Sequence, residues 1–307
     1  MTMLVFAISD KGGTGRSVTS TNIAFRRALQ GDDVCYLDFD FGSPTVGAIF
    51  GVRSAERGTE RGGMHSYLQE KTEDPYRVDI WTDSDRSALR SRPPGAGQLI
   101  LLPGDSSGGE FPASPRAVDR CVRLFSRLRE EFDLCMVDLS AGRSYAADMV
   151  LAATARAELS DVPFRWLVFH RWTRQHIIAA AGLVFERRGL LDVGAAHGHD
   201  KTALAERIRF VRTAVVEANA PERSALRSTQ LAWLDECDRD LHELARRHGV
   251  GRTAMLGKVP LDPVLQWREQ ILVDEDVYAS QIANESTIRA FDHIATKIFD
   301  ARAWEGL

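Results

Sequence analysis

Short apolar runs alternate along this chain with stretches in which apolar residues recur at the spacing of a helix. The runs predict strands over residues 3–8, 34–37, 98–102, 134–137, 166–169, 208–216 and 253–256. The helical stretches are residues 17–30, 114–131, 144–157, 173–187, 222–248, 262–270 and 277–299. Strands that alternate with helices predict βαβ units and a parallel sheet, and uncharged strands suit a sheet covered by helices on both faces. We therefore expect an α/β fold with a doubly wound, mostly parallel sheet flanked by helices.

Two stretches interrupt this alternation. Residues 53–97 are rich in Arg, Gly, Ser, Asp and Pro, which predicts a polar surface excursion with one short helix near 64–71. Residues 190–200 are rich in Gly and His and are expected to form a connection. No linker separates two cores, so we expect residues 1–307 to form a single domain.

Composition narrows the class of protein. Apolar residues make up 44% of the chain and charged residues 27%, which is ordinary for a soluble globular protein and excludes disordered, collagen-like and coiled-coil chains. The net charge of −4 argues against a polyanion-binding surface over the whole molecule but leaves a local basic patch open. No apolar run approaches the ~20 residues that span a bilayer. The N-terminal run is too short and too poor in basic residues for a signal peptide, so a cytoplasmic location is expected.

The turn after the first predicted strand carries the clearest chemistry. It reads Asp10-Lys11-Gly12-Gly13-Thr14-Gly15-Arg16-Ser17 and leads into a predicted helix. In such a loop backbone N–H groups converge on phosphate oxygens, the helix dipole favours the anion, and a side chain on the glycines would block its approach. Ser17 would offer its hydroxyl to Mg²⁺. The usual pattern GxxxxGK[ST] fails at two positions, however, where Asp10 replaces a glycine and Arg16 a lysine.

At this point the sequence resembles the MinD/ParA/Mrp ATPases, whose deviant phosphate loop reads KGGxG[KR][ST] and opens with an extra lysine, here Lys11. The resemblance continues through three further segments in the expected order. Residues 34–44 resemble the strand that ends in DxD before the first switch, and residues 132–142 resemble the Walker B strand and second switch. Residues 256–262, Leu-Gly-Lys-Val-Pro-Leu-Asp, resemble the segment beside the adenine.

The resemblance implies a P-loop NTPase with ATP and Mg²⁺ as cofactors, and it assigns roles to individual residues. Ser17 would ligate Mg²⁺, Asp138 would hold the metal through a water, and Asp38 would support the metal site and first switch. Asp40 would orient the attacking water, assisted by the charges of Lys11 and Arg16, and Lys11 would reach the phosphates of a partner copy in a nucleotide-sandwich dimer. The nucleotide would be bound by Lys11, Gly12, Gly13, Thr14, Gly15, Arg16, Ser17, Val18 and Pro260.

Three positions depart from the family pattern. Arg16 replaces the loop lysine, Ser140 stands where the second switch usually has proline, and Arg212-Thr213 occupies the place of an asparagine that reads adenine. The guanidinium of Arg16 can bind two phosphate oxygens. If it binds the substrate and the transition state equally tightly, it does not raise the rate of hydrolysis. The expected activity is therefore a slow ATPase that acts as a dimerising switch on a partner. A nucleotide-binding scaffold with little or no turnover is the alternative.

The partner remains open at this level. Arg116, Arg120, Arg123 and Arg127 form one stripe of the helix 114–131, which suits a solvated face, a DNA backbone or a protein partner. Residues 298–307 carry too few basic residues for a membrane-binding helix, so direct membrane binding is not expected. Cys35, Cys121, Cys135 and Cys237 contain no CxxC pair, which argues against an iron–sulfur role and favours buried free thiols.

Overall fold

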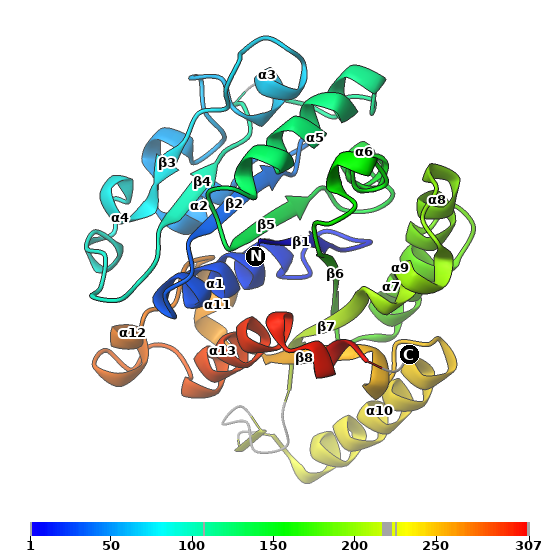
Figure 1. The fold of residues 1–307 in the computed structure, drawn as a ribbon. Helices are drawn as coiled ribbons and strands as arrows, with labels where there is room; N and C mark the ends of the chain where they lie inside the picture. Colours follow the sequence, from blue (N-terminus) through cyan, green and yellow to red (C-terminus); the bar gives the residue numbers. More distant parts are fainter. Residues whose placement is uncertain (1, 107, 217–222, 225, 306–307) are drawn as a thin grey trace.

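A single eight-stranded sheet organises the chain in the computed structural model, which describes residues 2–106, 108–216, 223–224 and 226–305 (Figure 1). The strand order is β3-β4-β2-β5-β1-β6-β7-β8. All neighbouring strands are parallel except β3 and β4, which are antiparallel. The strands are β1 Met3–Ile8, β2 Val34–Phe39, β3 Val78–Asp79, β4 Leu99–Leu102, β5 Leu134–Leu139, β6 Phe164–Arg171, β7 Ile208–Val215 and β8 Met255–Pro260.

Helices cover both faces of this sheet. The longer ones are α1 Arg16–Leu29, α5 Pro115–Leu128, α6 Tyr145–Thr154, α7 Arg174–Phe185, α8 Leu190–His197, α10 Ser228–Arg247 and α13 Glu285–Phe299. The shorter ones are α2 Val46–Phe50, α3 Met64–Leu68, α4 Ile80–Asp83, α9 Lys201–Glu206, α11 Pro263–Trp267 and α12 Asp274–Tyr278.

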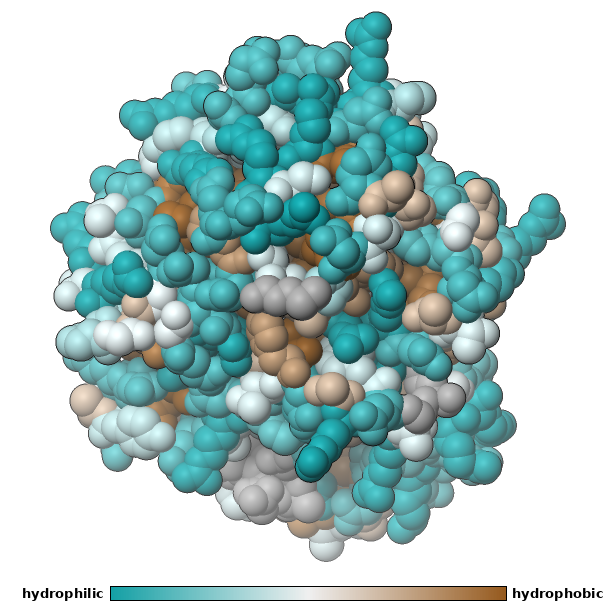
Figure 2. Space-filling model, viewed as in Figure 1, coloured by the Kyte–Doolittle hydropathy of each residue, from teal (hydrophilic) through white to brown (hydrophobic). Residues whose placement is uncertain are grey.

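The two faces of β1 show how the core is divided. Leu4, Phe6 and Ile8 are buried in a cluster that includes residues of α5, α6 and α7, whereas Val5 and Ala7 join a cluster with α1 and α13. Successive side chains of a strand point to opposite faces, so an uncharged strand buries both. The predicted doubly wound, mostly parallel α/β fold is confirmed. In the space-filling view, hydrophilic residues cover most of the face shown, with apolar residues in patches between them (Figure 2).

The segment 53–97 contributes more to the core than its composition predicts. It contains α3, the edge strand β3 and α4, and it buries Met64, Tyr67, Trp81 and Leu89. The prediction of a surface excursion with one helix therefore missed structure whose apolar residues stand singly or in pairs between polar ones. Such a pattern gives no periodic signal.

Three other predicted segments also differ from the structure. Residues 190–200 were expected to form a connection, but they contain α8, which ends at Gly198 in the left-handed conformation. The predicted helix 277–299 is divided into α12 and α13. The predicted helix 222–248 is α10 from Ser228, and its expected start at Glu222 lies outside the described residues.

Candidate functional site

The loop between β1 and α1 lies open at the carboxyl end of the sheet. Gly13 and Gly15 have φ of +70° and +74°, a conformation that side chains disfavour, and Gly15 precedes the first turn of α1. No side chain caps the N-terminus of α1. Its first backbone N–H groups therefore remain available to bind an anion. The hydroxyl of Thr213 in β7 donates a hydrogen bond to the carbonyl of Thr14, which fixes the loop to the sheet.

Two acidic residues end neighbouring strands beside this loop. Asp38 in β2 lies opposite Asp138 in β5 in the parallel register, and their exposed fractions are 1% and 0%. Burial raises the pKa of Asp38 well above its usual value, and the charges of Asp138 and Asp40 raise it further. Burial also raises the pKa of Asp138, although the charge of Arg16 opposes the shift. Carboxylates buried this deeply need a cation or hydrogen-bond donors.

Arg16 supplies that cation. Its Nε lies 2.5 Å from Oδ1 of Asp138, and its Nη2 lies 2.8 Å from Oδ2 of Asp40 and 3.3 Å from Oγ of Ser17. The side chain is 6% exposed. Burial disfavours the guanidinium charge, but Asp138 and Asp40 outweigh this and raise the pKa of Arg16 above its usual value. Phosphate binding by Arg16 stays a prediction; in this structure its guanidinium binds the two carboxylates.

Two cavities meet along the phosphate loop and share Gly13, Thr14, Gly15, Val18 and Glu269. The smaller one, of about 160 Å³, also contacts Gly12, Arg16, Ser17 and Asp40. The larger one, of about 400 Å³, extends to Thr213, Pro260 and Trp267. Together they form a site for an elongated ligand with an anionic end. Of the predicted site residues, Asp38 and Asp138 are buried and line neither cavity, and Lys11 is exposed on the loop.

Comparisons with known proteins identify the fold. No protein-family model matches the chain. Cytosolic Fe-S cluster assembly factors CFD1 from Yarrowia lipolytica and Phaeosphaeria nodorum are 26% and 35% identical over 141 and 97 residues, or 46% and 32% of this chain. The matches span 42% and 29% of those relatives, less than half of each.

Solved structures match over nearly the whole chain. MinD from Pyrococcus horikoshii with Mg-ADP has a TM-score of 0.56 at 14% identity and covers 98% of both chains. A putative plasmid partition protein from Borrelia burgdorferi bound to AMPPNP has a TM-score of 0.62 at 13% identity, covering 98% of this chain and 99% of its own. A ParA family ATPase from Chlorobium tepidum has a TM-score of 0.56 at 13% identity, covering 96% and 98%. The chain has the MinD/ParA fold. The resemblance predicted from the sequence motifs is confirmed.

Several residues of the candidate site were not predicted from the sequence. Trp267 is 86% exposed and lines the larger cavity from α11, a helix without buried residues. Arg171, Gln266 and Glu269 also line it. A tryptophan soon after the predicted adenine segment is the sequence signal that could have indicated this wall.

The three departures from the family pattern have definite places in the structure. Arg212 is buried with its guanidinium 3.8 Å from the ring centre of Trp172, outside the cavity, whereas Thr213 lines it. The hydroxyl of Ser140 accepts a hydrogen bond from the N–H of Phe41 at 3.0 Å and lies 3.3 Å from the carbonyl of Phe39. Ser140 therefore connects the loops that follow Asp38 and Asp138, which a proline could not do.

The predicted arginine stripe on α5 is not a free basic surface. Arg120 is buried, and its guanidinium binds the carbonyls of Tyr67, Thr72 and Glu73. Arg116 pairs with Glu70 at 3.6 Å and Arg127 with Asp74 at 2.5 Å, while Arg123 is exposed. Helical spacing placed the four side chains on one face correctly, but it could not reveal that residues 67–74 cover much of that face.

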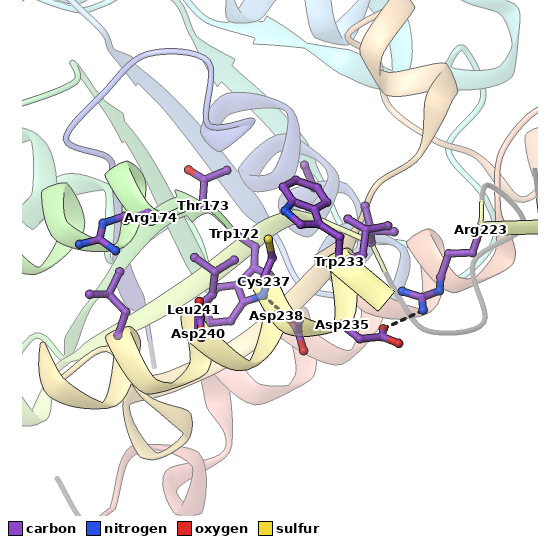
Figure 3. A pocket seen from close by; sticks show the side chains of 14 residues that line it. Trp172, Thr173, Arg174, Arg223, Trp233, Asp235, Cys237, Asp238, Asp240 and Leu241 are labelled. Atoms are coloured by element: carbon purple, nitrogen blue, oxygen red, sulfur yellow. Dashed lines mark hydrogen bonds and ion pairs between the residues drawn. The ribbon is translucent and has the colours of Figure 1, made fainter. Parts of the chain in front are cut away.

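A separate groove of about 520 Å³ lies beside α10 (Figure 3). Trp233, 62% exposed, and Leu241 line it from α10, and Trp172 lines it from the loop after β6. Hydrogen bonds join Trp172 to Asp238 and Arg223 to Asp235. Ala214 contacts both this groove and the larger cavity of the candidate site, so the two are neighbours.

Within the part of the chain that is described, no three His, Cys, Asp or Glu residues are grouped to hold an ion. Cys35, Cys121 and Cys135 are buried free thiols, and Cys237 is half-buried. Of the described helices, none combines the length and apolar character that a bilayer crossing needs.

Proposed function

We propose that the chain is a nucleotide-dependent switch that binds ATP with Mg²⁺, dimerises around the nucleotide and hydrolyses it slowly in order to position or regulate a protein partner. One combination of features supports this proposal. An open glycine loop and an uncapped helix N-terminus line two joined cavities, and two buried acidic strand ends lie close to Arg16 of that loop. The loop N–H groups of residues 12–17 would bind the phosphates. The proposal places this activity in the cytoplasm.

The oxygen groups beside the loop fit magnesium. Oδ2 of Asp138 is buried and has no hydrogen-bond partner among the described residues. Ser17 lines the smaller cavity. Mg²⁺ prefers oxygen ligands and is commonly held by one or two carboxylates plus substrate phosphates. Ser17 and Asp138 would hold the ion, with Asp38 behind them, and the ion would neutralise phosphate charge. Asp40, 23% exposed, borders the phosphate cavity, where it would position the attacking water.

The base would occupy the larger cavity. Pro260 and the indole of Trp267 offer apolar surface to a flat ring, and Thr213 and Gln266 offer polar groups at its edge. Trp267 in particular presents an exposed aromatic ring, which can stack on any base. Lys11 is exposed on the loop, and it would reach a partner copy across a shared nucleotide.

Isothermal titration calorimetry with Mg²⁺ and a non-hydrolysable ATP analogue tests nucleotide binding. Gly13→Ala and Gly95→Ala form a matched pair. The φ angles of Gly13 and Gly95 are +70° and +82°, and a Cβ added at either position would have no atom within 4 Å. Each substitution should cost a similar ~1–2 kcal/mol of backbone strain. Only Gly13→Ala should weaken nucleotide binding. Equal affinity in both variants, or no binding by the wild type, would contradict the proposal.

A nucleotide-binding scaffold with little turnover is the second candidate, and one observation favours it. Asp40, the proposed water-positioning residue, is held by Arg16 at 2.8 Å. Single-turnover hydrolysis separates the two functions: a switch predicts slow hydrolysis that Arg16→Lys accelerates several-fold, since a compact ammonium follows charge toward the β–γ bridge. Binding without hydrolysis in both proteins would select the scaffold.

A further inference from the structure

The guanidinium of Arg16 lies among the very groups to which the proposed function assigns magnesium and the attacking water. Its two nitrogens contact Asp138 at 2.5 Å, Asp40 at 2.8 Å and the hydroxyl of Ser17 at 3.3 Å. These contacts leave the guanidinium engaged on the acidic side of the site. Arg16 also lines the smaller cavity, which would hold the phosphates.

The surroundings explain why a cation is needed there in the absence of nucleotide. Asp138 is fully buried, Asp38 is opposite it in the register, and Asp40 follows two residues later. Three carboxyl groups gathered at the ends of two adjacent strands repel one another, and an unpaired buried charge is costly. Arg16, itself 6% exposed, is the side chain that pairs with two of the three.

We propose that Arg16 is the resident cation of the magnesium site in the nucleotide-free chain, and that it must leave Asp138 and Asp40 before the metal can bind there. This inference rests on the proposed function for the identity of the site. A divalent ion and a guanidinium contacting the same carboxylates compete directly, since both neutralise the same charge.

The competition makes metal binding depend on nucleotide. Phosphate oxygens offer the forked guanidinium an alternative anion, and the small cavity already contacts both Arg16 and the loop that would hold the phosphates. When Arg16 turns to a phosphate, Asp138 loses its counter-charge and becomes available to Mg²⁺, and Asp40 becomes free to position the attacking water. In the nucleotide-free chain Arg16 would therefore keep Mg²⁺ out of the site. The metal would bind only once the nucleotide is present.

Manganese binding to the nucleotide-free full chain tests this directly, because Mn²⁺ binds oxygen ligands as Mg²⁺ does and its electron paramagnetic resonance signal reports the free ion. The wild type should bind Mn²⁺ weakly. Arg16→Ala should bind it at least about tenfold tighter, since the competing charge is gone, and Mn²⁺ should raise the Tm of this variant more than that of the wild type. Arg16→Lys, which keeps a cation, should resemble the wild type.

Arg26→Ala provides the matched control. Arg26 is on the same helix, is 4% exposed and contacts Asp274 at 2.7 Å and Asp292 at 3.8 Å, so its removal also uncovers two carboxylates. It should gain no comparable Mn²⁺ affinity. Adding Asp138→Asn to Arg16→Ala should abolish the gain, which assigns it to this site. Circular dichroism verifies that each variant is folded, and Arg16→Gln replaces Arg16→Ala if the latter is not.

Three outcomes would overturn the inference: equal Mn²⁺ affinity in the wild type and Arg16→Ala, an equal gain in Arg26→Ala, or a gain that survives Asp138→Asn. The measurement uses no nucleotide, so it is distinct from the test of the proposed function. If the wild type binds the ATP analogue but Arg16→Ala gains no Mn²⁺ affinity, the inference alone fails. If Arg16→Ala gains affinity but the wild type binds no nucleotide, the resident cation stands and the proposed function fails.

Discussion

Arg120 and Tyr67 hold each other by their side chains and their backbones at once. The guanidinium of Arg120 lies 4.0 Å from the ring centre of Tyr67, and its Nε donates to the Tyr67 carbonyl at 3.1 Å. In return the Tyr67 hydroxyl donates to the Arg120 carbonyl at 3.1 Å. These contacts join α5 to the segment 64–74, so Arg120 serves the fold.

Arg120→Ala should therefore lower the free energy of unfolding by about 2–4 kcal/mol, because it leaves buried carbonyls without donors and removes a cation–π contact. Arg123→Ala is the matched control on the same helix, exposed and expected to change stability by less than ~0.5 kcal/mol. Urea denaturation of the two variants measures the difference. Equal free energies of unfolding in the two variants would contradict a stabilising role for Arg120.

Parts of the fold were predictable because their signals are local. The uncharged runs at β1, β2 and β5 and the glycine loop before α1 each lie within a few consecutive residues, and the acidic strand ends follow directly. The segment 53–97 was not, since Met64, Trp81 and Leu89 are buried by contacts with distant parts of the chain. α8 was missed because Gly194 and Gly198 suggest a loop, although Gly194 lies inside the helix and only Gly198 ends it.

The candidate site likewise contains residues that could be predicted from the sequence and residues that could not. Glycines and carboxylates could be assigned from their places in the motifs, but the direction of Arg16 could not, because its partner Asp138 is 122 positions away. Trp267 was missed for the opposite reason: an exposed side chain leaves no trace in the hydrophobic pattern. The long-range ion pair of Arg16 and the exposed wall formed by Trp267 could therefore be found only from the structure.

Trp267→Ala should weaken binding of the ATP analogue by about 1–2 kcal/mol, roughly five- to thirtyfold, because it removes the aromatic wall of the larger cavity. Trp233→Ala removes another exposed tryptophan, one that lines the groove at α10 instead. It should leave the affinity within about twofold of the wild type. Calorimetry compares the three proteins, and an equal loss in both variants would argue against stacking at Trp267.

Lys11→Ala should retain nucleotide binding in the monomer and lose nucleotide-dependent dimerisation. Lys11 is exposed on the loop, and from there it would reach the nucleotide bound by a second copy of the chain. Lys71→Ala, an exposed lysine on the segment 53–97, is the control for loss of one positive charge. Light scattering with Mg²⁺ and the ATP analogue should give a dimer for the wild type and Lys71→Ala only. A dimer of Lys11→Ala at the same concentration would count against the cross-interface role.

His170 should make the folded state sensitive to acid. It is 1% exposed, and burial lowers its pKa from 6.5 to about 4; the hydrogen bond from Nδ1 to the Arg171 carbonyl opposes the shift, and the charges of Arg212 and His176 add to it. The folded state therefore resists a proton that the unfolded state accepts. Above pH 6.5 neither state holds that proton and His170 has no effect. As the pH falls from 6.5 to 4, stability should decline by up to about 3 kcal/mol.

His170→Gln should remove this decline, and His248→Gln, which changes an exposed histidine at the end of α10, should preserve it. Asp38 and Asp138 complicate the absolute profile, because their raised pKa values make the folded state the better proton acceptor and so favour stability on acidification. Both carboxylates are present in all three proteins, so the difference between the variants isolates His170. Urea denaturation at pH 7.0 and pH 4.5 should therefore show a smaller loss of stability in His170→Gln than in the wild type or His248→Gln. Equal losses would mean that the unfolded and folded states protonate His170 alike, and that its burial carries no free-energy cost for the charge.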